Sequence, residues 1–438
     1  MSIALDLARR AEEGRPVRVA LIGSGEMGTD IVTQLSLMPG IDLAVLAEMR
    51  VDMAWSALDI AGIPREAARL CRGVQDVEDT IRGGKIAITP DSAAACSAAQ
   101  VDVIIDATGN PGVGAELALQ AMSHGKHVVM MNVEADVTVG AMLVREARKA
   151  GVGYSLGAGD EPSAAMELIN FVRSLGYPIV SAGKGKNNPL KFDATLAEYE
   201  EEARQRHMNP RMLVEFIDGS KTMIEMCAIA NATGLVPDCP GMHGPAATPD
   251  RLASTLIPVA DGGVLSRSGV VDYSVGKGVA PGVFVVIKAP HPRVHERLSD
   301  LKMGPGPYFT FLRPYHLTSL EVPLTAASLV LHGTPHMQPL DEPVAECGCV
   351  AKAALAPGVT LGKIGEDHYR GWITTVEDAR AHDLLPMGLA ERAIVTKPIQ
   401  PGESLTYDNC RVDETMQIVK LRRKQDALFT PAARTRVA

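Results

Sequence analysis

The sequence predicts an α/β fold that begins with a parallel sheet, continues into a central α+β region and ends in a small β-rich region. Two observations predict the first part. Residues 17–150 alternate apolar, β-branched runs with runs of helical length, and residues 17–28, VRVALIGSGEMG, join an apolar strand to a glycine turn and a helix start. Alternation of this kind implies parallel strands with helices on both faces of the sheet.

The glycine turn is the most informative of these segments. Gly23 permits the turn, Gly25 lets the backbone approach a pyrophosphate, and Gly28 lets the helix pack close to the strand. Free amide groups and the positive end of the helix dipole then face the phosphates. The pattern predicts a dinucleotide-binding (Rossmann) domain, and the alternative is a glycine-rich turn of some other α/β protein. The residues assigned to cofactor binding here are Gly23, Ser24, Gly25, Glu26, Met27 and Gly28.

The elements up to residue 160 follow in alternation. We expect strands at 17–23, 41–49, 85–90, 101–109, 126–136 and 152–160, and helices at 29–38, 112–125 and 139–151, with 52–82 mostly helical. The first sixteen residues read as a short amphipathic helix.

The strand at 41–49 carries the residues that distinguish the two nicotinamide nucleotides. An acid at its end bonds the 2′-hydroxyl of NAD, whereas an arginine accommodates the 2′-phosphate of NADP. Glu48 and Arg50 offer both, so NADPH is expected and NADH stays open; a surface Glu/Arg pair is the alternative. Ligands of parallel sheets lie at the carboxyl ends of the strands. The residues that this rule adds to the cofactor site are Ala107, Thr108, Gly109, Asn132 and Glu134.

The region from 160 to about 335 has the profile of a substrate domain. Turn clusters are frequent, helices are expected at 162–176 and 219–234, and 282–288 and 308–312 alternate as in an antiparallel sheet. From about 342 the chain is β-rich, and 350–365 and 391–410 form a weak repeat of a strand, a Pro-Gly turn and a polar tail. Residues 421–438 are basic and polar, and we expect them to fray.

Length and composition limit the class of protein. A chain of 438 residues should hold two or three domains, which we place at 1–160, 161–340 and 341–438. The net charge of −9 argues against nucleic acid as a partner. No apolar run approaches the length of a membrane span, and the start of the chain has no secretion-signal pattern. The seven scattered cysteines suggest reduced thiols, so we expect a cytoplasmic protein.

A lysine-rich loop, GKGKNNP at 183–189, follows the apolar run 177–183. Lys184 and Lys186 with Asn187 and Asn188 make a compact set of cations and donors that suits a carbonyl oxygen or a phosphate. A lysine beside a reacting carbonyl can stabilise the developing alkoxide. The alternative is a solvated basic loop.

The helix expected at 219–234 supplies further candidates. Ser220 and Lys221 stand at its anion-friendly N-terminus, and Glu225 lies one turn after Lys221, where a surface i, i+4 pair is the alternative. Asn231 and Thr233 end the helix and can equally serve as its C-cap. Together we expect catalytic roles for Lys184, Lys186, Lys221, Glu225 and Asp160, and substrate-binding roles for Asn187, Asn188, Ser220, Asn231, Thr233 and His316.

Four acids follow the last strands of the first region. Glu134, Asp136, Asp160 and Glu161 can hold a divalent cation or transfer protons, although Asp160 and Glu161 can equally cap the helix that begins near Pro162. The acids are scattered, so Mg²⁺ or Mn²⁺ held mostly by substrate and one or two carboxylates is a possibility without a defined ligand set.

Several long segments together resemble the homoserine-dehydrogenase-like oxidoreductases that carry a C-terminal SAF domain. The segments are VALIGSGEMG, MMNVEADVTVG, AGKGKNNP, DGSKTMIEMCAIANATGL, YHLTSLEVP, VAKAALAPGVTLGKIG and LPMGLAERAIVTKPIQPGESLTYDN. The resemblance extends over nearly the whole chain, and within the group the chain is most similar to the 1-deoxy-D-xylulose 5-phosphate reductoisomerase-like (DRL) enzymes. It implies a homodimer of three domains, an SAF-like domain at 341–438, and NADPH-dependent synthesis of 2-C-methyl-D-erythritol 4-phosphate for isoprenoid precursors.

Three functions are therefore open at this point. The first is a reductoisomerase acting on a branched or deoxy sugar phosphate, for which the lysines would supply the cations. The second is a homoserine-dehydrogenase-like NAD(P) dehydrogenase acting on another small hydroxy or oxo metabolite. The third is a cofactor-binding sensor without catalysis, in which the SAF module contacts a carbohydrate or a partner.

Overall fold

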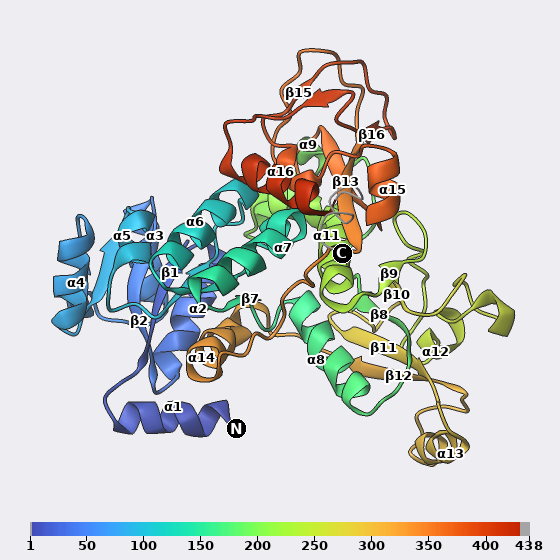
Figure 1. Ribbon diagram of the computed structural model, residues 1–438, viewed down its shortest axis with the longest axis horizontal. Helices are drawn as coiled ribbons and strands as arrows, with labels where there is room; N and C mark the ends of the chain where they lie inside the picture. The colour runs from blue at the N-terminus through green and yellow to red at the C-terminus, as the bar shows by residue number, and fades with distance from the viewer. Residues whose placement is uncertain (1, 430–438) are drawn as a thin grey trace. The chain divides into compact units, whose positions relative to one another are not determined.

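The computed structural model describes residues 2–429 and divides into two compact units (Figure 1). Among the described residues, the first unit comprises 2–163 and 317–341, and the second comprises 164–316 and 342–429. Each unit is thus built from two separate stretches of the chain. The three-domain division expected from the sequence stays a prediction.

The first unit is organised around a sheet of seven parallel strands, in the order β3-β4-β2-β1-β5-β6-β7. This confirms the predicted parallel α/β fold. The strands are β1 (Val17–Ile22), β2 (Ile41–Ala47), β3 (Ala68–Leu70), β4 (Ile86–Thr89), β5 (Val103–Asp106), β6 (His127–Met130) and β7 (Tyr154–Leu156). The order changes direction at β1, which lies between β2 and β5. In open sheets of this kind such a switch point is where ligands bind.

Helices connect the strands of the first unit. They are α1 (Ile3–Glu12), α2 (Glu26–Leu37), α3 (Val51–Ile60), α4 (Val74–Arg82), α5 (Ser92–Ser97), α6 (Pro111–Ser123), α7 (Val133–Ala150) and α14 (Val322–His332), with 3₁₀ turns η1 (Arg65–Ala67) and η3 (Thr318–Glu321). In Figure 1 the orange α14 lies among the blue and teal elements of this unit, although its residues come late in the chain.

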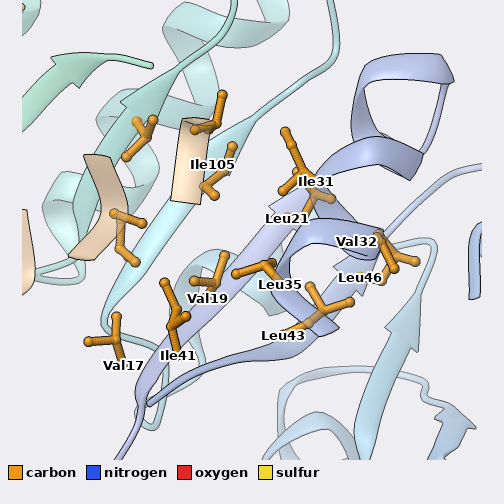
Figure 2. Packing of buried hydrophobic residues seen from close by; sticks show 14 of the residues in the cluster. Val17, Val19, Leu21, Ile31, Val32, Leu35, Ile41, Leu43, Leu46 and Ile105 are labelled. Atoms are coloured by element: carbon orange, nitrogen blue, oxygen red, sulfur yellow. The ribbon is translucent and has the colours of Figure 1, made fainter. Parts of the chain in front are cut away.

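The core of the first unit forms where α2 packs on the sheet. Figure 2 shows Val19 of β1, Ile31 and Leu35 of α2, Leu43 of β2 and Ile105 of β5 directed at one another. Buried apolar residues of α14 complete the same cluster. Apolar burial of this kind contributes about 25 cal/mol per Å² removed from water, so α14 is part of the structural support of the nucleotide-binding sheet.

Two boundaries in the first unit differ from expectation. The strand expected to continue to residue 136 ends at Met130, and α7 begins at Val133. The cause is the side chain of Asn132, which accepts a hydrogen bond from the amide of Ala135 at 3.1 Å and caps the helix. The helical region expected at 52–82 contains the short edge strand β3.

The second unit contains a mixed five-stranded sheet, in the order β12-β11-β8-β10-β9. Its strands are β8 (Ile179–Gly185), β9 (Val236–Pro237), β10 (Val270–Ser274), β11 (Val283–Lys288) and β12 (Tyr308–Arg313). The expected antiparallel pairing of the last two strands is confirmed, and β8 runs parallel to β10 and antiparallel to β11. Its helices are α8 (Glu161–Ser174), which starts in the first unit, α9 (Leu196–Gln205), α10 (Pro210–Ile217), α11 (Ser220–Thr233), α12 (Leu252–Thr255) and α13 (Pro292–Asp300), with η2 (Val259–Asp261).

The C-terminal stretch forms small antiparallel sheets within the second unit. The elements are β13 (Ala345–Ala351), β14 (Tyr369–Thr375), α15 (Val376–Ala381), η4 (Met387–Leu389), β15 (Ile394–Val395), β16 (Ser404–Leu405), β17 (Cys410–Arg411) and α16 (Gln417–Phe429). Helix α11, buried along most of its length, contacts β10, β13 and β14. The C-terminal stretch therefore packs directly on α11, the helix that also contacts the five-stranded sheet.

The expectation that residues 421–438 fray is wrong for the part that the structure describes. Residues 417–429 form α16, in which Ile418 and Leu421 are buried and Arg422 pairs with the buried Glu346 at 2.5 Å. Residues 430–438 lie outside the described residues. Within 2–429 the structure has no helix both long and apolar enough to cross a membrane.

Candidate active site

The glycine turn after β1 leaves no room for side chains at two of its glycines. Gly23 has a φ of +98°, and a Cβ there would lie 2.7 Å from the carbonyl oxygen of Ala107. A Cβ at Gly28 would lie 2.2 Å from the carbonyl oxygen of Gly23. Both obstacles are backbone atoms, which do not swing aside as a side chain can. The turn therefore requires glycine at both positions and brings the ends of β1 and β5 together.

Gly25 has the opposite environment. It is the N-cap residue of α2, and an ideal Cβ there would meet no heavy atom of the described residues beyond its chain neighbours within 4 Å. The first amide groups of a helix have no acceptor inside the helix, and the helix dipole favours an anion at this end. An unobstructed helix start after a tight strand-to-helix turn fits the pyrophosphate of a dinucleotide.

Glu48 ties the end of β2 to this turn. Its carboxylate accepts hydrogen bonds from the amide of Ser24 at 2.9 Å, from the hydroxyl of Ser24 at 3.1 Å and from the amide of Arg50 at 3.0 Å. The Arg50 side chain is exposed and donates to the sulfur of Met53. An acid for a ribose hydroxyl and a cation for a 2′-phosphate thus follow the same strand, so the choice of nucleotide stays a prediction.

Polar side chains brace the ends of β5 and β6. The buried Asp106, whose pKa is raised by burial, accepts hydrogen bonds from the amide and hydroxyl of Thr108 at 2.9 and 2.7 Å. Asn132 caps α7 through Ala135 and donates from Nδ2 to the carbonyl oxygen of Asn110 at 2.6 Å. With Asn132 engaged in this way, the backbone of 107–109 is the part of this edge best suited to a cofactor.

The acids proposed for cation binding or proton transfer have distinct surroundings. Glu134 and Asp136 are buried in the first turn of α7. Asp136 accepts a hydrogen bond from the hydroxyl of Tyr154 at 2.8 Å, and burial raises its pKa to about 7. Asp160 and Glu161 are half-buried where β7 leads into α8. Their proposed roles stay predictions.

In the second unit, Lys184 and Lys186 are both buried, each with 6% of its surface exposed. Lys184 belongs to β8, and Lys186 is the first residue after this strand. The two lysines are two positions apart, and side chains at this spacing along an extended chain point to the same face. The ammonium of Lys184 forms an ion pair with the carboxylate of Glu225 on α11. The two lysines are therefore buried and are not the solvated basic residues of the alternative interpretation, while their catalytic roles stay predictions.

Lys186 completes this pair of cations. Its ammonium donates to the carbonyl oxygen of Phe216 at 2.6 Å. Burial, reinforced by the charge of Lys184, lowers the pKa of Lys186 to about 8, while Glu225 and Asp218 partly oppose this shift. A lysine with a pKa near neutrality can both hold an oxyanion and give up a proton.

The start of α11 is anchored by the C-terminal stretch of the chain. Asp218, fully buried, pairs with Lys352 at 3.1 Å and accepts the amide of Ser220 at 2.9 Å. The hydroxyl of Ser220 in turn accepts the amide of Gly371 at 2.8 Å. Sequence reasoning missed Lys352, because 134 positions separate it from Asp218 and no local pattern marks the pair.

The other candidates on α11 are used differently. Asn231 accepts the amides of Val344 and Ala345, each at 2.9 Å, and so holds the start of β13. The hydroxyl of Thr233 donates to the carbonyl oxygen of Ile229 at 2.6 Å, within the helix. These contacts favour a structural role for both side chains. Substrate binding by Asn231 and Thr233 stays a prediction.

The last candidates lie in loops or at element ends. Asn187 is exposed, and Asn188 donates to its side chain at 3.4 Å. Lys221 is half-buried in the first turn of α11, and His316 is half-buried at the end of the segment that follows β12. The structure thus brings Lys184, Lys186 and Glu225 together.

Comparison with known families accounts for both halves of this arrangement. Residues 23–156 match the family model of the homoserine dehydrogenase NAD-binding domain, and residues 159–322 match that of the catalytic domain of oxidoreductase DRL. These two stretches therefore match domains of the DRL and homoserine dehydrogenase-like NAD(P)-dependent oxidoreductases. The matched segments hold the glycine turn in one case and Lys184, Lys186 and Glu225 in the other. The SAF-like interpretation of 341–438 stays a prediction.

Individual relatives are more distant. A homoserine dehydrogenase from Methylobacillus glycogenes is 30% identical over 118 residues, which is 27% of this chain and 25% of that protein. An NAD binding oxidoreductase from Klebsiella pneumoniae is 18% identical with a TM-score of 0.30, covering 42% of this chain and 47% of that one. A DOX-P reductoisomerase in complex with NADPH, fosmidomycin and magnesium is 15% identical with a TM-score of 0.35, covering 49% and 58%. The chain therefore spans between 25% and 58% of the length of these proteins, and TM-scores this low support no inference about function.

Proposed function

We propose that this oxidoreductase is an NADPH-dependent reductoisomerase that converts 1-deoxy-D-xylulose 5-phosphate into 2-C-methyl-D-erythritol 4-phosphate. The observation that carries the proposal is the buried cationic site of the second unit, within a segment that matches the DRL catalytic domain. Three lysines of this unit are buried: Lys184 pairs with Glu225, Lys352 pairs with Asp218, and Lys186 donates to the carbonyl oxygen of Phe216. A buried ammonium group whose acceptor is a neutral carbonyl favours an anionic substrate.

The lysines supply the electrostatic part of the reaction. Lys184, held by Glu225, is directed as an ammonium donor for the carbonyl oxygen that becomes an alkoxide during rearrangement and reduction. Lys186 has a pKa suited to returning a proton to that oxygen at neutral pH. Bound nicotinamide nucleotide supplies the hydride, and the open N-terminus of α2 at Gly25 would hold its pyrophosphate.

A divalent cation belongs to the proposal as a second polarising group for the ketone and its neighbouring hydroxyl. Asp160 and Glu161 are consecutive half-buried carboxylates, and oxygen ligands of this type suit Mg²⁺ or Mn²⁺. Turnover should then be lost in EDTA and restored by either metal. A homodimer and a cytoplasmic location, which the resemblance implies, are tested by light scattering and by cell fractionation.

The deciding experiment is a substrate panel. NADPH and NADH oxidation are followed with 1-deoxy-D-xylulose 5-phosphate, its unphosphorylated ketose and small aldehydes or ketones, and products are identified by NMR. A branched tetrol phosphate supports the proposal. Reduction of the carbonyl without rearrangement contradicts it and supports a plain dehydrogenase. Nucleotide binding with no turnover on any compound contradicts both and favours the sensor.

A matched pair of variants links turnover to the site. Lys186→Met should abolish turnover while nucleotide binding survives. Lys126→Met serves as control, because Lys126 is also a buried lysine that donates to a backbone carbonyl, that of Val101 at 2.7 Å, but lies in the first unit away from the proposed chemistry. Equal turnover in the two variants would remove the proposed role of Lys186.

A homoserine-dehydrogenase-like reaction on another hydroxy or oxo metabolite is the second candidate. The match of 23–156 to the homoserine dehydrogenase NAD-binding domain favours it. That match concerns the nucleotide and leaves the substrate to the second unit, where the buried ammonium of Lys186 disfavours an amino-acid semialdehyde that carries its own ammonium group.

A further inference from the structure

Arg370 brings a further cation to the start of α11 from the C-terminal stretch. It lies on β14, next to Gly371, whose amide donates to the hydroxyl of Ser220 at 2.8 Å. A Cβ at Gly371 would lie 3.3 Å from the Cα of Ser220, so the strand passes close to the helix end. The neighbour of Arg370 in the chain is thus fixed on the first turn of α11.

The guanidinium of Arg370 lies over two aromatic rings. It lies 4.2 Å from the ring centre of Phe192 and 4.5 Å from that of Trp372, and the two rings meet edge to face at 5.7 Å. The Trp372 ring occupies the space that a side chain at Gly241 would need. Stacking of this kind orients the planar guanidinium while leaving its edge N–H groups available.

Arg370 has no carboxylate partner among residues 2–429. Its hydrogen bond is a long one, from Nη1 to the carbonyl oxygen of Gly371 at 3.4 Å. The other stacked arginines of this unit differ: Arg423, over Tyr407, pairs with Glu414 at 2.8 Å. A half-buried guanidinium with only a weak acceptor is an expensive arrangement unless a ligand completes it.

The electrostatic neighbours of Arg370 place it at the lysine site. Burial lowers its pKa, and the charges of Asp218 and Tyr273 oppose that shift. Asp218 acts in the same way on Lys186, and Tyr273 pairs with Lys184 in the register of β10 and β8. Arg370 and Lys186 therefore share Asp218 as an electrostatic neighbour.

We propose that Arg370 binds the phosphate of the substrate whose carbonyl end is held by Lys184 and Lys186. The inference rests on the proposed function for the reacting end of that substrate. Lys184 and Lys352 are each paired with a carboxylate, whereas Lys186 donates to the carbonyl oxygen of Phe216 and Arg370 donates weakly to that of Gly371. A phosphate monoester carries close to two negative charges at pH 7 and can accept from both cations. The planar fork of arginine suits phosphate oxygens.

The test compares Arg370→Gln with Arg423→Gln as a stacked-arginine control. Arg370→Gln should raise KM for 1-deoxy-D-xylulose 5-phosphate about 10- to 100-fold, as expected for lost hydrogen bonds to a charged group, with kcat largely kept. Inorganic phosphate should inhibit the wild type and the control equally, and Arg370→Gln correspondingly less. Unchanged KM and unchanged inhibition, or a loss of NADPH affinity instead, would overturn the inference.

Two measurements keep this test separate from the proposed function and from folding. Calorimetric binding of inorganic phosphate to the full chain needs no turnover, so it decides on Arg370 even if no ketose phosphate is a substrate. Arg370→Lys keeps the positive charge but loses the planar pair of N–H donors, and it replaces Arg370→Gln in the test if the glutamine variant does not fold. It should weaken phosphate binding while the melting temperature holds, and wild-type phosphate affinity in it would contradict a forked contact.

Discussion

Lys184 of β8 and Glu225 of α11 form an ion pair from which water is almost excluded, since their side chains are 7% and 1% exposed. The two residues are 41 positions apart in the chain, and they join the central strand of the mixed sheet to its main helix. A pair in this position serves the fold and the chemistry together, and the two contributions can be separated by mutation.

Lys184→Met should destabilise the protein by roughly 3–5 kcal/mol, because it leaves Glu225 buried without its partner. The double variant Lys184→Met/Glu225→Met removes both charges and should recover much of that stability. Neither variant should turn over substrate. Urea unfolding and a turnover assay check both statements. A double variant as unstable as the single one, or one that retains activity, would contradict the assignment.

Turnover should decline as pH rises through about 8, because deprotonation of Lys186 removes a cation from the developing alkoxide. Lys186→Arg, which stays charged, should abolish this decline even if its rate is lower. A pH–rate profile of wild type and variant is the measurement. An identical alkaline limb in both proteins would assign it to another group.

Deprotonation of Lys186 should raise the stability of the folded protein, although it lowers turnover. The pKa of Lys186 in the folded protein is about 8, below the ordinary lysine value of 10.5. The buried ammonium therefore destabilises the folded state at pH below 8. This penalty, about 3 kcal/mol, is relieved as pH rises from 8 to 10.5. Replacing Lys186 with Met should flatten that part of the stability profile, measured by denaturant unfolding at each pH.

Two glycines of the opening turn should respond differently to alanine. Gly25→Ala meets open space and should leave the melting temperature of the nucleotide-free protein unchanged, while NADPH affinity falls about 10- to 100-fold through lost contacts to the pyrophosphate. Gly28→Ala collides with the backbone at Gly23 and should lower stability itself, by about 1–3 kcal/mol. Tight nucleotide binding by Gly25→Ala would rule out a pyrophosphate at this helix start.

Nucleotide preference should depend on the two residues after β2. Glu48→Gln keeps an acceptor for Ser24 but removes the charge that repels a 2′-phosphate, so the NADPH/NADH ratio of kcat/KM should rise. Arg50→Ala should lower that ratio. Arg65→Ala, an exposed arginine of the same unit paired with Asp59, provides the control. If the NADPH/NADH ratio of kcat/KM changed equally in all three variants, neither Glu48 nor Arg50 would contact the 2′-position of the nucleotide.

Local patterns predicted much of the first unit and the frame of the second. The glycine turn, the parallel sheet and the helix at 220–233 each depend on residues close in sequence. Helices α9 and α10 were missed although both carry local start signals: Thr195 and Glu198 form a capping box, and Asn209 caps a helix that begins with Pro210. Helix α9 is strongly charged and α10 has only eight residues, so neither shows a long apolar periodicity.

The site was harder to predict because its decisive contacts are long-range. Helical spacing suggested Lys221 as a partner of Glu225, which stays a prediction, but it gave no sign of the ion pair that Glu225 forms with Lys184 of β8. Lys352 and Arg370 come from a stretch whose sequence suggested only a small β-rich module. Nothing in the local pattern indicates that β14 passes the start of α11, since that contact depends on how two distant segments pack.

The discontinuous first unit has a consequence for how the protein is made. Helix α14 and Met337, which bonds to Leu156 at the edge of the sheet, belong to this unit but are translated after most of the second. During synthesis on the ribosome, the apolar face of the first unit that packs against α14 therefore stays uncovered until residues 317–341 emerge. The final assembly of this unit is postponed past the usual N-terminal-first order of domain folding, so a nascent chain halted before α14 should be vulnerable to proteases and dependent on chaperones.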